Sequence, residues 1–310
     1  MRVKVLGSAA GGGFPQWNCA CPQCAGVRSG TIKARARTQA QAAISPDGSR
    51  WFLLNASPDL RQQVLSSADF VPPAGSRNSP ISAVILTSAD VDAVMGLLHL
   101  REFQPLHIFA TLAVRRIVTE ENSLFRVLAR SNPPVKWEVL SLDRLIPLIP
   151  PSLADKKSGL FCKAVSLNGS FPDYVSETLR NSLAPEEAVI GLTLVSKEKK
   201  LFYAPNLPGV GDQWARCVEE SDLAILDGTF WKDDELNSIQ KGCKSARQMG
   251  HLPLWGDRGL LRHPFRPSKT RRVLIHINNT NPILNDESQE ARIVRDAGWE
   301  IAYDGMELAI

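Results

Sequence analysis

The sequence has few histidines and no long apolar run. It contains five histidines in 310 residues, which argues against a hydrolase whose two metal ions are held by several histidines. No apolar stretch reaches the roughly 18 residues that a membrane-spanning helix needs. The beginning of the chain lacks the apolar segment of a secretory signal peptide, because Gly7 interrupts it after one short strand. We therefore expect a cytoplasmic protein with no membrane partner.

Motifs for nucleic acids, nucleotides and serine-hydrolase chemistry are also missing. The net charge is +4 and no run of Lys or Arg is long, so we expect no nucleic-acid partner, although a small anionic substrate would suit this charge. The glycine-rich segment 7–13 lacks the G-x-G-x-x-G spacing, and no Gly-Lys-Ser/Thr follows it. No Gly-x-Ser-x-Gly elbow is present. The glycine turn is therefore expected to let the backbone pass close to a site.

Short β-branched runs alternate with helical patterns along the whole chain, which predicts an α/β fold. With 44% hydrophobic residues, the chain can bury a large core. No separable domains are evident, so we expect one domain over residues 1–310, with two sheets facing each other and helices outside. The polar stretch 166–187 is expected to be a loop over a site. The expected strands are 3–6, 41–45, 51–55, 83–87, 107–110, 161–165, 189–194, 201–204, 223–226 and 272–277, and the expected helices are 92–101, 112–121, 212–220 and 286–297, with another opening at 57–59.

Three of the six cysteines form a Cys-x-Cys-x-x-Cys cluster. Cys19, Cys21 and Cys24 lie on a short turn where their sulfurs can converge. Thiolates this close repel one another unless a soft cation neutralises them, and zinc does so. The cluster indicates a metalloprotein. The other three cysteines are scattered and are interpreted as reduced thiols.

Acidic residues follow an apolar strand at Asp90 and Asp92. Two carboxylates at positions i and i+2 of a strand-to-helix turn can point to one side and serve as metal ligands or as a general base. The alternative is an ordinary helix cap with an acid in the first turn. Two other predicted strands end in Asp227 and His276, so all four side chains are expected to gather at one edge of the sheets.

His251 has a weaker local pattern, in the segment Met249-Gly250-His251-Leu252-Pro253. It is compatible with a helix cap, a substrate contact or a residue that supports the metal ligands. The sequence leaves these three roles open.

Together these motifs resemble the metallo-β-lactamase superfamily, and within it the family of coenzyme PQQ synthesis protein B. The resemblance runs nearly end to end. The matching blocks are Val5 to Cys19, Arg37-Thr38-Gln39, Leu54 to Asp59, Gly96 to Glu102, Phe202-Tyr203-Ala204-Pro205, Asp227-Gly228-Thr229, Met249-Gly250-His251, His276 to Pro282 and Tyr303-Asp304-Gly305.

The resemblance implies an αββα sandwich that works in the synthesis of pyrroloquinoline quinone (PQQ), a cofactor built from a cross-linked glutamate and tyrosine. The family is similar to iron-dependent hydroxylases that use O₂ to add oxygen to the tyrosine ring. The resemblance also implies a structural zinc site at Cys19, Cys21 and Cys24. A related phosphodiesterase branch has a histidine as the fourth zinc ligand, and here Asn279 stands at that place. The fourth ligand is therefore Asn279 or water.

The chain departs from the superfamily motif His-x-His-x-Asp-His at Ala93. The family keeps Asp-His where this chain has Asp92-Ala93, and alanine cannot bind a metal. The expected active-site ligands are then Asp90, Asp92, Asp227 and His276. This set favours Fe(II), Mn(II) or Mg(II) over zinc.

Three functional hypotheses follow. In the first, Fe²⁺ supports hydroxylation, His251 is an acid/base group or a substrate contact, and Arg37 and Arg101 pair with substrate carboxylates. In the second, the catalytic metal is lost and the protein binds or transports PQQ or its anionic precursor. The third is a metal-dependent hydrolase such as a phosphodiesterase. A homodimer is possible under all three.

Overall fold

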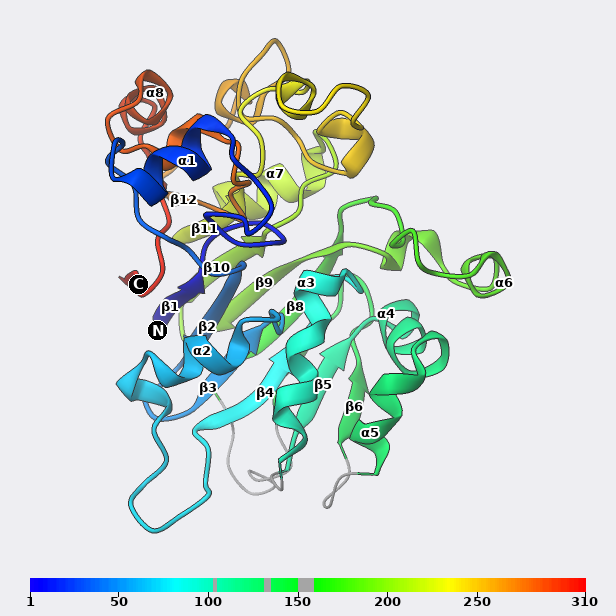
Figure 1. Ribbon diagram of the computed structural model, residues 1–310. Helices are drawn as coiled ribbons and strands as arrows, with labels where there is room; N and C mark the ends of the chain where they lie inside the picture. The colour runs from blue at the N-terminus through cyan, green and yellow to red at the C-terminus, as the bar shows by residue number, and fades with distance from the viewer. Residues whose placement is uncertain (103–104, 131–134, 150–158) are drawn as a thin grey trace.

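Two mixed β-sheets pack face to face in the computed structural model, which describes residues 1–102, 105–130, 135–149 and 159–310 (Figure 1). The first sheet has the strand order β14-β1-β2-β3-β4-β5-β6, in which β3 to β6 are parallel and the other pairs antiparallel. Its strands are β1 (Arg2–Gly7), β2 (Gln41–Ser45), β3 (Trp51–Leu54), β4 (Ile81–Ile85), β5 (His107–Ala110), β6 (Lys136–Val139) and β14 (Glu307–Ala309).

The second sheet repeats this plan with the order β13-β12-β11-β10-β9-β8-β7. Strands β10 to β13 are parallel, and β7 to β10 pair antiparallel. Its strands are β7 (Leu145–Pro147), β8 (Phe161–Ser166), β9 (Ile190–Ser196), β10 (Lys199–Ala204), β11 (Leu223–Asp227), β12 (Arg271–Ile275) and β13 (Trp299–Ile301).

The central strands are apolar on both faces because both faces are covered. In β3, Phe52 and Leu54 belong to the core between the two sheets, whereas Trp51 and Leu53 pack on the helical side. Side chains alternate between the faces of a strand, so a strand between two apolar layers has no polar position. This explains why β3 and β4 read as continuous apolar runs.

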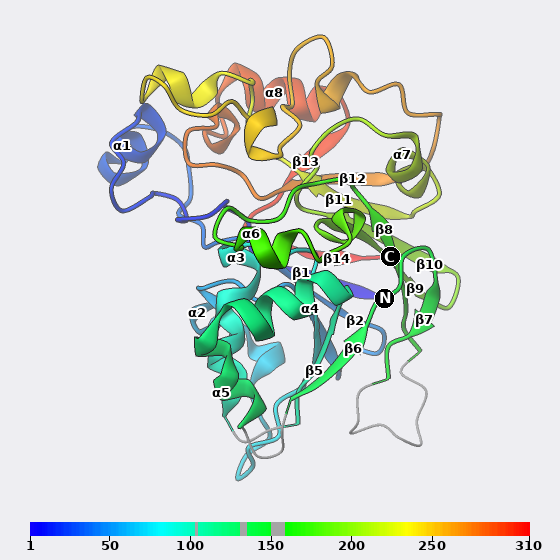
Figure 2. The same ribbon diagram turned by 90° about the vertical axis from the view of Figure 1, so that its right-hand side faces the viewer.

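Helices cover the outer face of each sheet, so the layers are αββα, as the sequence predicted (Figures 1 and 2). Helices α2 to α5 lie against the first sheet, and α1, α7 and α8 lie on the side of the second. Among the described residues, no helix combines the length and the apolar character that crossing a bilayer requires. The α-helices are α1 (Pro22–Ser29), α2 (Leu60–Leu65), α3 (Val91–Val94), α4 (Leu112–Arg116), α5 (Arg126–Ala129), α6 (Glu177–Arg180), α7 (Asp212–Glu219) and α8 (Gln289–Asp296).

The predicted helix at 92–101 is the clearest difference between the expected and observed elements. Helix α3 ends at Val94 and continues as a 3-10 helix over Met95–Arg101. Gly96 donates its N–H to the carbonyl of Ala56, and a Cβ at Gly96 would lie 2.2 Å from the Ser57 carbonyl oxygen. The helix is therefore pressed against the segment after β3, which fixes the acidic turn that precedes it.

Candidate active site and cysteine cluster

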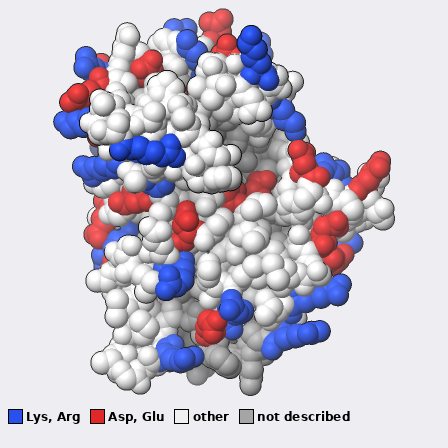
Figure 3. Space-filling model, in the orientation of Figure 1, with Lys and Arg blue, Asp and Glu red and all other residues white. Residues whose placement is uncertain are grey.

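The carboxyl ends of the parallel strands meet at one edge of the sandwich and surround a cavity of about 430 Å³, which we call the central cavity. The turn that carries Asp90 and Asp92 follows β4, Asp227 ends β11, and His276 follows β12. Figure 3 shows acidic side chains in a hollow at the middle of this face. Asp90, Asp92, Ala93, His251 and His276 are among the residues that line the cavity.

Asn55 holds the acidic turn in place from the end of the neighbouring strand. Its Oδ1 accepts the N–H of Thr87 at 2.8 Å, and its Nδ2 donates to Thr87 Oγ1 at 2.9 Å. The backbone at Asn55 has φ = 66°, a left-handed conformation that asparagine adopts more readily than most residues. Both hydrogen bonds are buried, so they fix the direction in which the turn that starts at Thr87 leaves β4.

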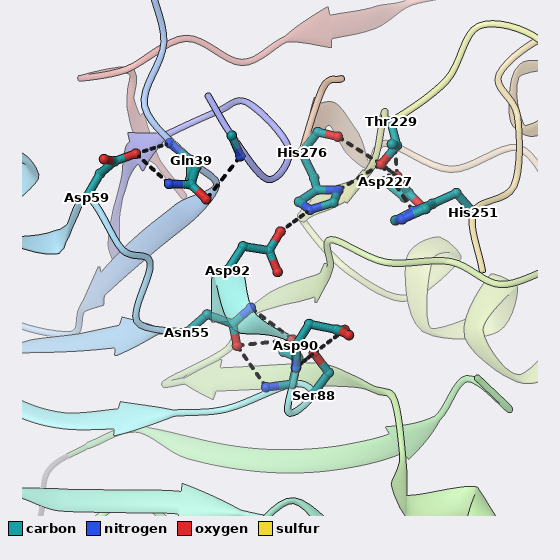
Figure 4. A network of polar contacts seen from close by, with 12 residues as sticks. Gln39, Asn55, Asp59, Ser88, Asp90, Asp92, Asp227, Thr229, His251 and His276 are labelled. Atoms are coloured by element: carbon teal, nitrogen blue, oxygen red, sulfur yellow. Dashed lines mark hydrogen bonds and ion pairs between the residues drawn. The ribbon is translucent and has the colours of Figure 1, made fainter. Parts of the chain in front are cut away.

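Asp92 and His276 form the closest polar contact across the central cavity (Figure 4). Asp92 Oδ2 lies 2.9 Å from His276 Nε2. Burial opposes a charge on either group. The hydrogen bond to His276 nevertheless lowers the pKa of Asp92, and Asp92, Asp227 and Asp90 raise the pKa of His276. Two ligand atoms that are each about 2.1 Å from one ion, at a right angle, lie about 3 Å apart. The pair therefore has the spacing of two ligands of one cation.

Thr229 orients the ring of His276. The Thr229 hydroxyl donates to Asp227 Oδ1 at 2.5 Å or to the His276 carbonyl at 2.8 Å. Because its only hydrogen is used in this way, Thr229 Oγ1 accepts the Nδ1 proton of His276 at 2.7 Å. His276 itself has φ = 60°, which turns its ring from the strand toward Asp92. Nε2 is thus the atom that faces the cavity. Thr229 had no individual role in the prediction.

Asp227 is fully buried, and four donors occupy its carboxylate. Oδ1 accepts the N–H and the hydroxyl of Thr229 at 2.9 and 2.5 Å, and Oδ2 accepts the N–H of Leu207 at 2.9 Å and His251 Nδ1 at 2.8 Å. Both carboxylate oxygens of Asp227 are therefore engaged in hydrogen bonds while no cation is bound. Asp227, His251 and His276 each bring a potential ligand atom within 4.8 Å of the others, and Asp227 also orients His251 through Nδ1.

His251 lies deeper in the site than its sequence pattern indicated. Asp227 holds its Nδ1, and its ring stacks on His276 with 5.2 Å between the centroids and 23° between the planes. Burial alone would raise the pKa of Asp227, but the charges of His251 and His276 keep it low. His251 lines the central cavity, with Nε2 free of this bonding.

Asp90 lies on the cavity wall beside Asp92, but its side chain is held locally. Its Oδ2 accepts the hydroxyl of Ser88 at 2.8 Å. Burial and the neighbouring charge of Asp92 raise the pKa of Asp90. Asp90 is thus a further carboxylate beside the Asp92–His276 pair, and its Oδ2 is engaged by Ser88.

The glycine loop closes the cavity above Asp92. A Cβ at Gly11 would lie 3.5 Å from Asp92 Oδ2, and the N–H of Gly12 donates to Gln39 Oε1 at 3.2 Å. Asp59 in turn accepts the backbone and side-chain N–H groups of Gln39 at 2.9 and 3.1 Å. The glycine turn therefore passes close to the site, as expected.

The structure does not bring Arg37 or Arg101 to the central cavity. The Arg37 guanidinium is buried, donates to the Ala302 carbonyl and lies 3.3 Å from Ser8 Oγ. Burial lowers the pKa of Arg37 to about 10. Arg101 is exposed and pairs with Glu102 at 3.2 Å. Both predicted substrate contacts are therefore wrong: Arg37 bonds within the fold and Arg101 points to solvent.

The sulfur atoms of Cys19, Cys21 and Cys24 converge at the start of α1, within 4.8 Å of one another. Backbone N–H groups of Gln16, Cys21 and Cys24 each point at a cluster sulfur at 3.4 Å. Burial raises the pKa of Cys21 to about 12, so a bound cation would have to displace its proton. Three convergent thiols with N–H support fit zinc.

Asn279 lies against this cluster, at the position predicted for a fourth ligand. Its Nδ2 is 3.4 Å from Cys24 Sγ and 3.7 Å from Cys21 Sγ. The next residue, Thr280, donates to Glu235, whose other oxygen accepts the N–H of Trp231 at 2.6 Å. Burial raises the pKa of Glu235 to about 7. Only Ile277 and Asn278 separate Asn279 from His276, so one short loop joins the cysteine cluster to the central cavity.

Comparisons with known proteins agree with this geometry. The family described as "Beta-lactamase superfamily domain" matches residues 50–277. Coenzyme PQQ synthesis protein B of a Methylorubrum extorquens strain is 39% identical over 308 residues, which cover 99% of each chain. The chain belongs to the coenzyme PQQ synthesis protein B family. The family resemblance and the metallo-β-lactamase fold expected from the sequence are thus confirmed.

Solved structures show the same relationship. The crystal structure of Zn²⁺-bound PqqB from Methylobacterium extorquens is 38% identical, covers 100% of both chains and has a TM-score of 0.89. Because that relative binds Zn²⁺, it supports zinc as a metal of this family. A diphosphatase of the PhnP family, 18% identical over 100% of this chain and 97% of its own, has a TM-score of 0.61 and shares the fold.

Proposed function

We propose that this protein acts in PQQ synthesis by hydroxylating the tyrosine ring of a Glu–Tyr cross-linked diamino acid with O₂. One oxygen atom enters the ring and the other leaves as water, with two electrons from an external reductant. The contact between Asp92 Oδ2 and His276 Nε2 at 2.9 Å carries the proposal, because it presents two ligand atoms to a cavity large enough for a phenol ring. Fe(II) held there would supply the activation of O₂, and Asp90 is a further carboxylate on the wall of the same cavity.

The chain's own residues have separate roles in this proposal. Asp92 and His276 would hold the cation, and Thr229 fixes the His276 ring so that Nε2 faces Asp92. His251, oriented by Asp227, lies at the cavity wall, where its Nε2 can exchange a proton with the phenolic oxygen of the substrate. The glycine loop lies over Asp92 and limits the access of water from that side.

Oxygen uptake tests the hydroxylase directly. Protein loaded anaerobically with Fe(II) is mixed with the diamino acid, O₂ and a two-electron reductant such as ascorbate, and the product is analysed by mass spectrometry. We expect O₂ consumption together with a product heavier by one oxygen atom, and neither with an Asp92→Asn variant. Iron-loaded wild-type protein that consumes no O₂ and forms no hydroxylated product would refute the hydroxylase.

A second function, binding or transport of PQQ or its precursor, is favoured by Ala93. Ala93 lines the cavity where the family keeps a histidine, so this position adds no ligand atom to the site. A protein that only binds PQQ or its precursor would not need a third side chain that binds the metal strongly. Calorimetry with metal-free protein distinguishes the two, since micromolar binding of PQQ supports the binding function and absence of heat exchange removes it.

A further inference from the structure

A second cavity adjoins the central one. It has a volume of about 450 Å³, and we call it the outer cavity. It lies between the segment 168–173, within the polar stretch predicted to be a loop over a site, and the segment 244–250 that leads to His251. Asp90, Asn206 and Met249 line both cavities. A ligand longer than one ring can therefore reach from the central cavity into the outer one past these three side chains.

The outer cavity offers lysine and arginine side chains, which the central cavity lacks. Lys244 and Arg247 line it. Lys244 Nζ is 3.0 Å from an Asp173 oxygen, with 60% and 88% of the two side chains exposed, and such an exposed ion pair stabilises a fold very little. The Arg247 guanidinium donates to the Arg258 carbonyl at 3.2 Å. No carboxylate lies within ion-pair distance of Arg247 among the residues that the structure describes. Both cations are thus available to a ligand carboxylate.

Asn206 provides a separate indication at the junction of the two cavities. It follows β10, and its side-chain oxygen Oδ1 is buried without a hydrogen-bond partner in the described part of the chain. A buried acceptor without a donor is unfavourable, and native structures rarely keep one. An N–H group of a ligand that extends from one cavity to the other would satisfy this oxygen.

We propose that the outer cavity binds the amino-acid end of the substrate. The substrate's α-carboxylates pair with Arg247 and Lys244, and one of its ammonium groups donates to Asn206 Oδ1. Its phenol ring then extends into the central cavity. This inference rests on the proposed function for the identity of the ligand, but it concerns recognition and not turnover. Arg247 and Asn206 take the substrate-binding role that the sequence had assigned to Arg37 and Arg101.

Anaerobic calorimetry with two ligands tests this assignment. The Glu–Tyr cross-linked diamino acid carries carboxylate and ammonium groups, whereas 4-methylphenol has only the ring. Removing a charge-assisted hydrogen bond typically weakens binding by roughly ten- to a hundredfold. We expect this loss for the diamino acid with Arg247→Ala, a partial recovery with Arg247→Lys and a smaller loss with Asn206→Ala. Binding of 4-methylphenol should be unchanged in all three variants.

Lys241→Ala is the matched control, because Lys241 is exposed on the same segment and lines neither cavity. The inference would be overturned if Arg247→Ala bound the diamino acid as tightly as the wild type does. It would also be overturned if this variant lost affinity for the diamino acid and for 4-methylphenol to the same extent. O₂ uptake measured in parallel separates this inference from the proposed function. If the variants lose affinity for the diamino acid alone but the wild type shows no turnover, only the hydroxylase is refuted. If the wild type turns over and Arg247→Ala binds the diamino acid normally, only the outer-cavity assignment is refuted. A wild-type protein that does not bind the diamino acid refutes both.

Discussion

His276 Nε2 lies 2.9 Å from Asp92 Oδ2, although 184 positions separate the two residues in the chain. Asp92 follows a strand of the first sheet, and His276 follows a strand of the second. The pair therefore forms only when the two sheets are packed. The same packing places the side chain of Ala93 at the cavity wall, with no ligand atom to add.

Restoring a histidine at position 93 should complete the metal site. We expect Ala93→His to raise the affinity for Fe(II) by roughly ten- to a hundredfold, because its imidazole would enter the cavity beside Asp92. Metal content per chain after anaerobic loading and gel filtration measures this. Ala93→Leu is the control of similar bulk without a ligand atom. If the wild-type protein already retains one iron as tightly as Ala93→His, the vacancy at this position has no consequence.

Replacing Asp227 should affect stability and leave metal binding nearly intact. Asp227→Asn places an amide NH₂ among four hydrogen-bond donors, which should lower the free energy of unfolding by roughly 1–3 kcal/mol. Denaturant titration measures the loss, and metal analysis of the folded protein should match the wild type. Asp92→Asn is the comparison and should lose the metal. Equal metal loss in both variants would make Asp227 a ligand.

A histidine at position 279 should strengthen the zinc site. Asn279 already lies 3.4 Å from Cys24 Sγ, and an imidazole is a far better zinc ligand than an amide. We expect Asn279→His to slow zinc loss to a chelator by roughly tenfold or more, followed with a colorimetric zinc indicator. Cys24→Ser should lose zinc faster than wild type. An unchanged rate in Asn279→His would exclude this side chain from the fourth position.

Ionisation of Glu235 should lower the free energy of unfolding as the pH rises. Its pKa is about 7 in the folded protein, against 4.5 as the ordinary value, so the folded state holds a proton that the unfolded state releases between these values. Its contribution is present below pH 4.5 and is lost as the pH rises to about 7, by roughly 2–3 kcal/mol. Denaturant titrations at pH 5 and pH 8 measure this difference. Glu235→Gln mimics the protonated carboxyl and should remove most of it; an unchanged slope would contradict the assignment.

The sequence was sufficient for the features that depend on local patterns. The apolar runs of β3 and β4 are buried, Asp227 and His276 lie at strand ends, and Asp92 lies in the helix that follows β4. The short edge strands β6 and β7 were missed because most of their positions are exposed, which removes the apolar signal. Likewise, the 3-10 continuation of α3 depends on the approach of Gly96 to residues about 40 positions earlier.

The roles of single site residues depended on distant contacts. A strand-end aspartate can bind a metal, accept hydrogen bonds or do both, and only the positions of Leu207, Thr229 and His251 show which hydrogen bonds Asp227 accepts. Arg37 was expected to meet a substrate because arginine suits bidentate recognition of a carboxylate. Its guanidinium instead donates to the carbonyl of Ala302, 265 positions away. A local sequence pattern does not indicate a contact between residues so far apart in the chain.

The short interval between His276 and Asn279 places the cavity and the cysteine cluster on one loop. Asn279 Nδ2 lies 3.4 Å from Cys24 Sγ, and three positions earlier in the chain His276 Nε2 faces Asp92. We expect a chemical change in the cluster, such as oxidation of its thiols, to displace this loop and with it the ring of His276.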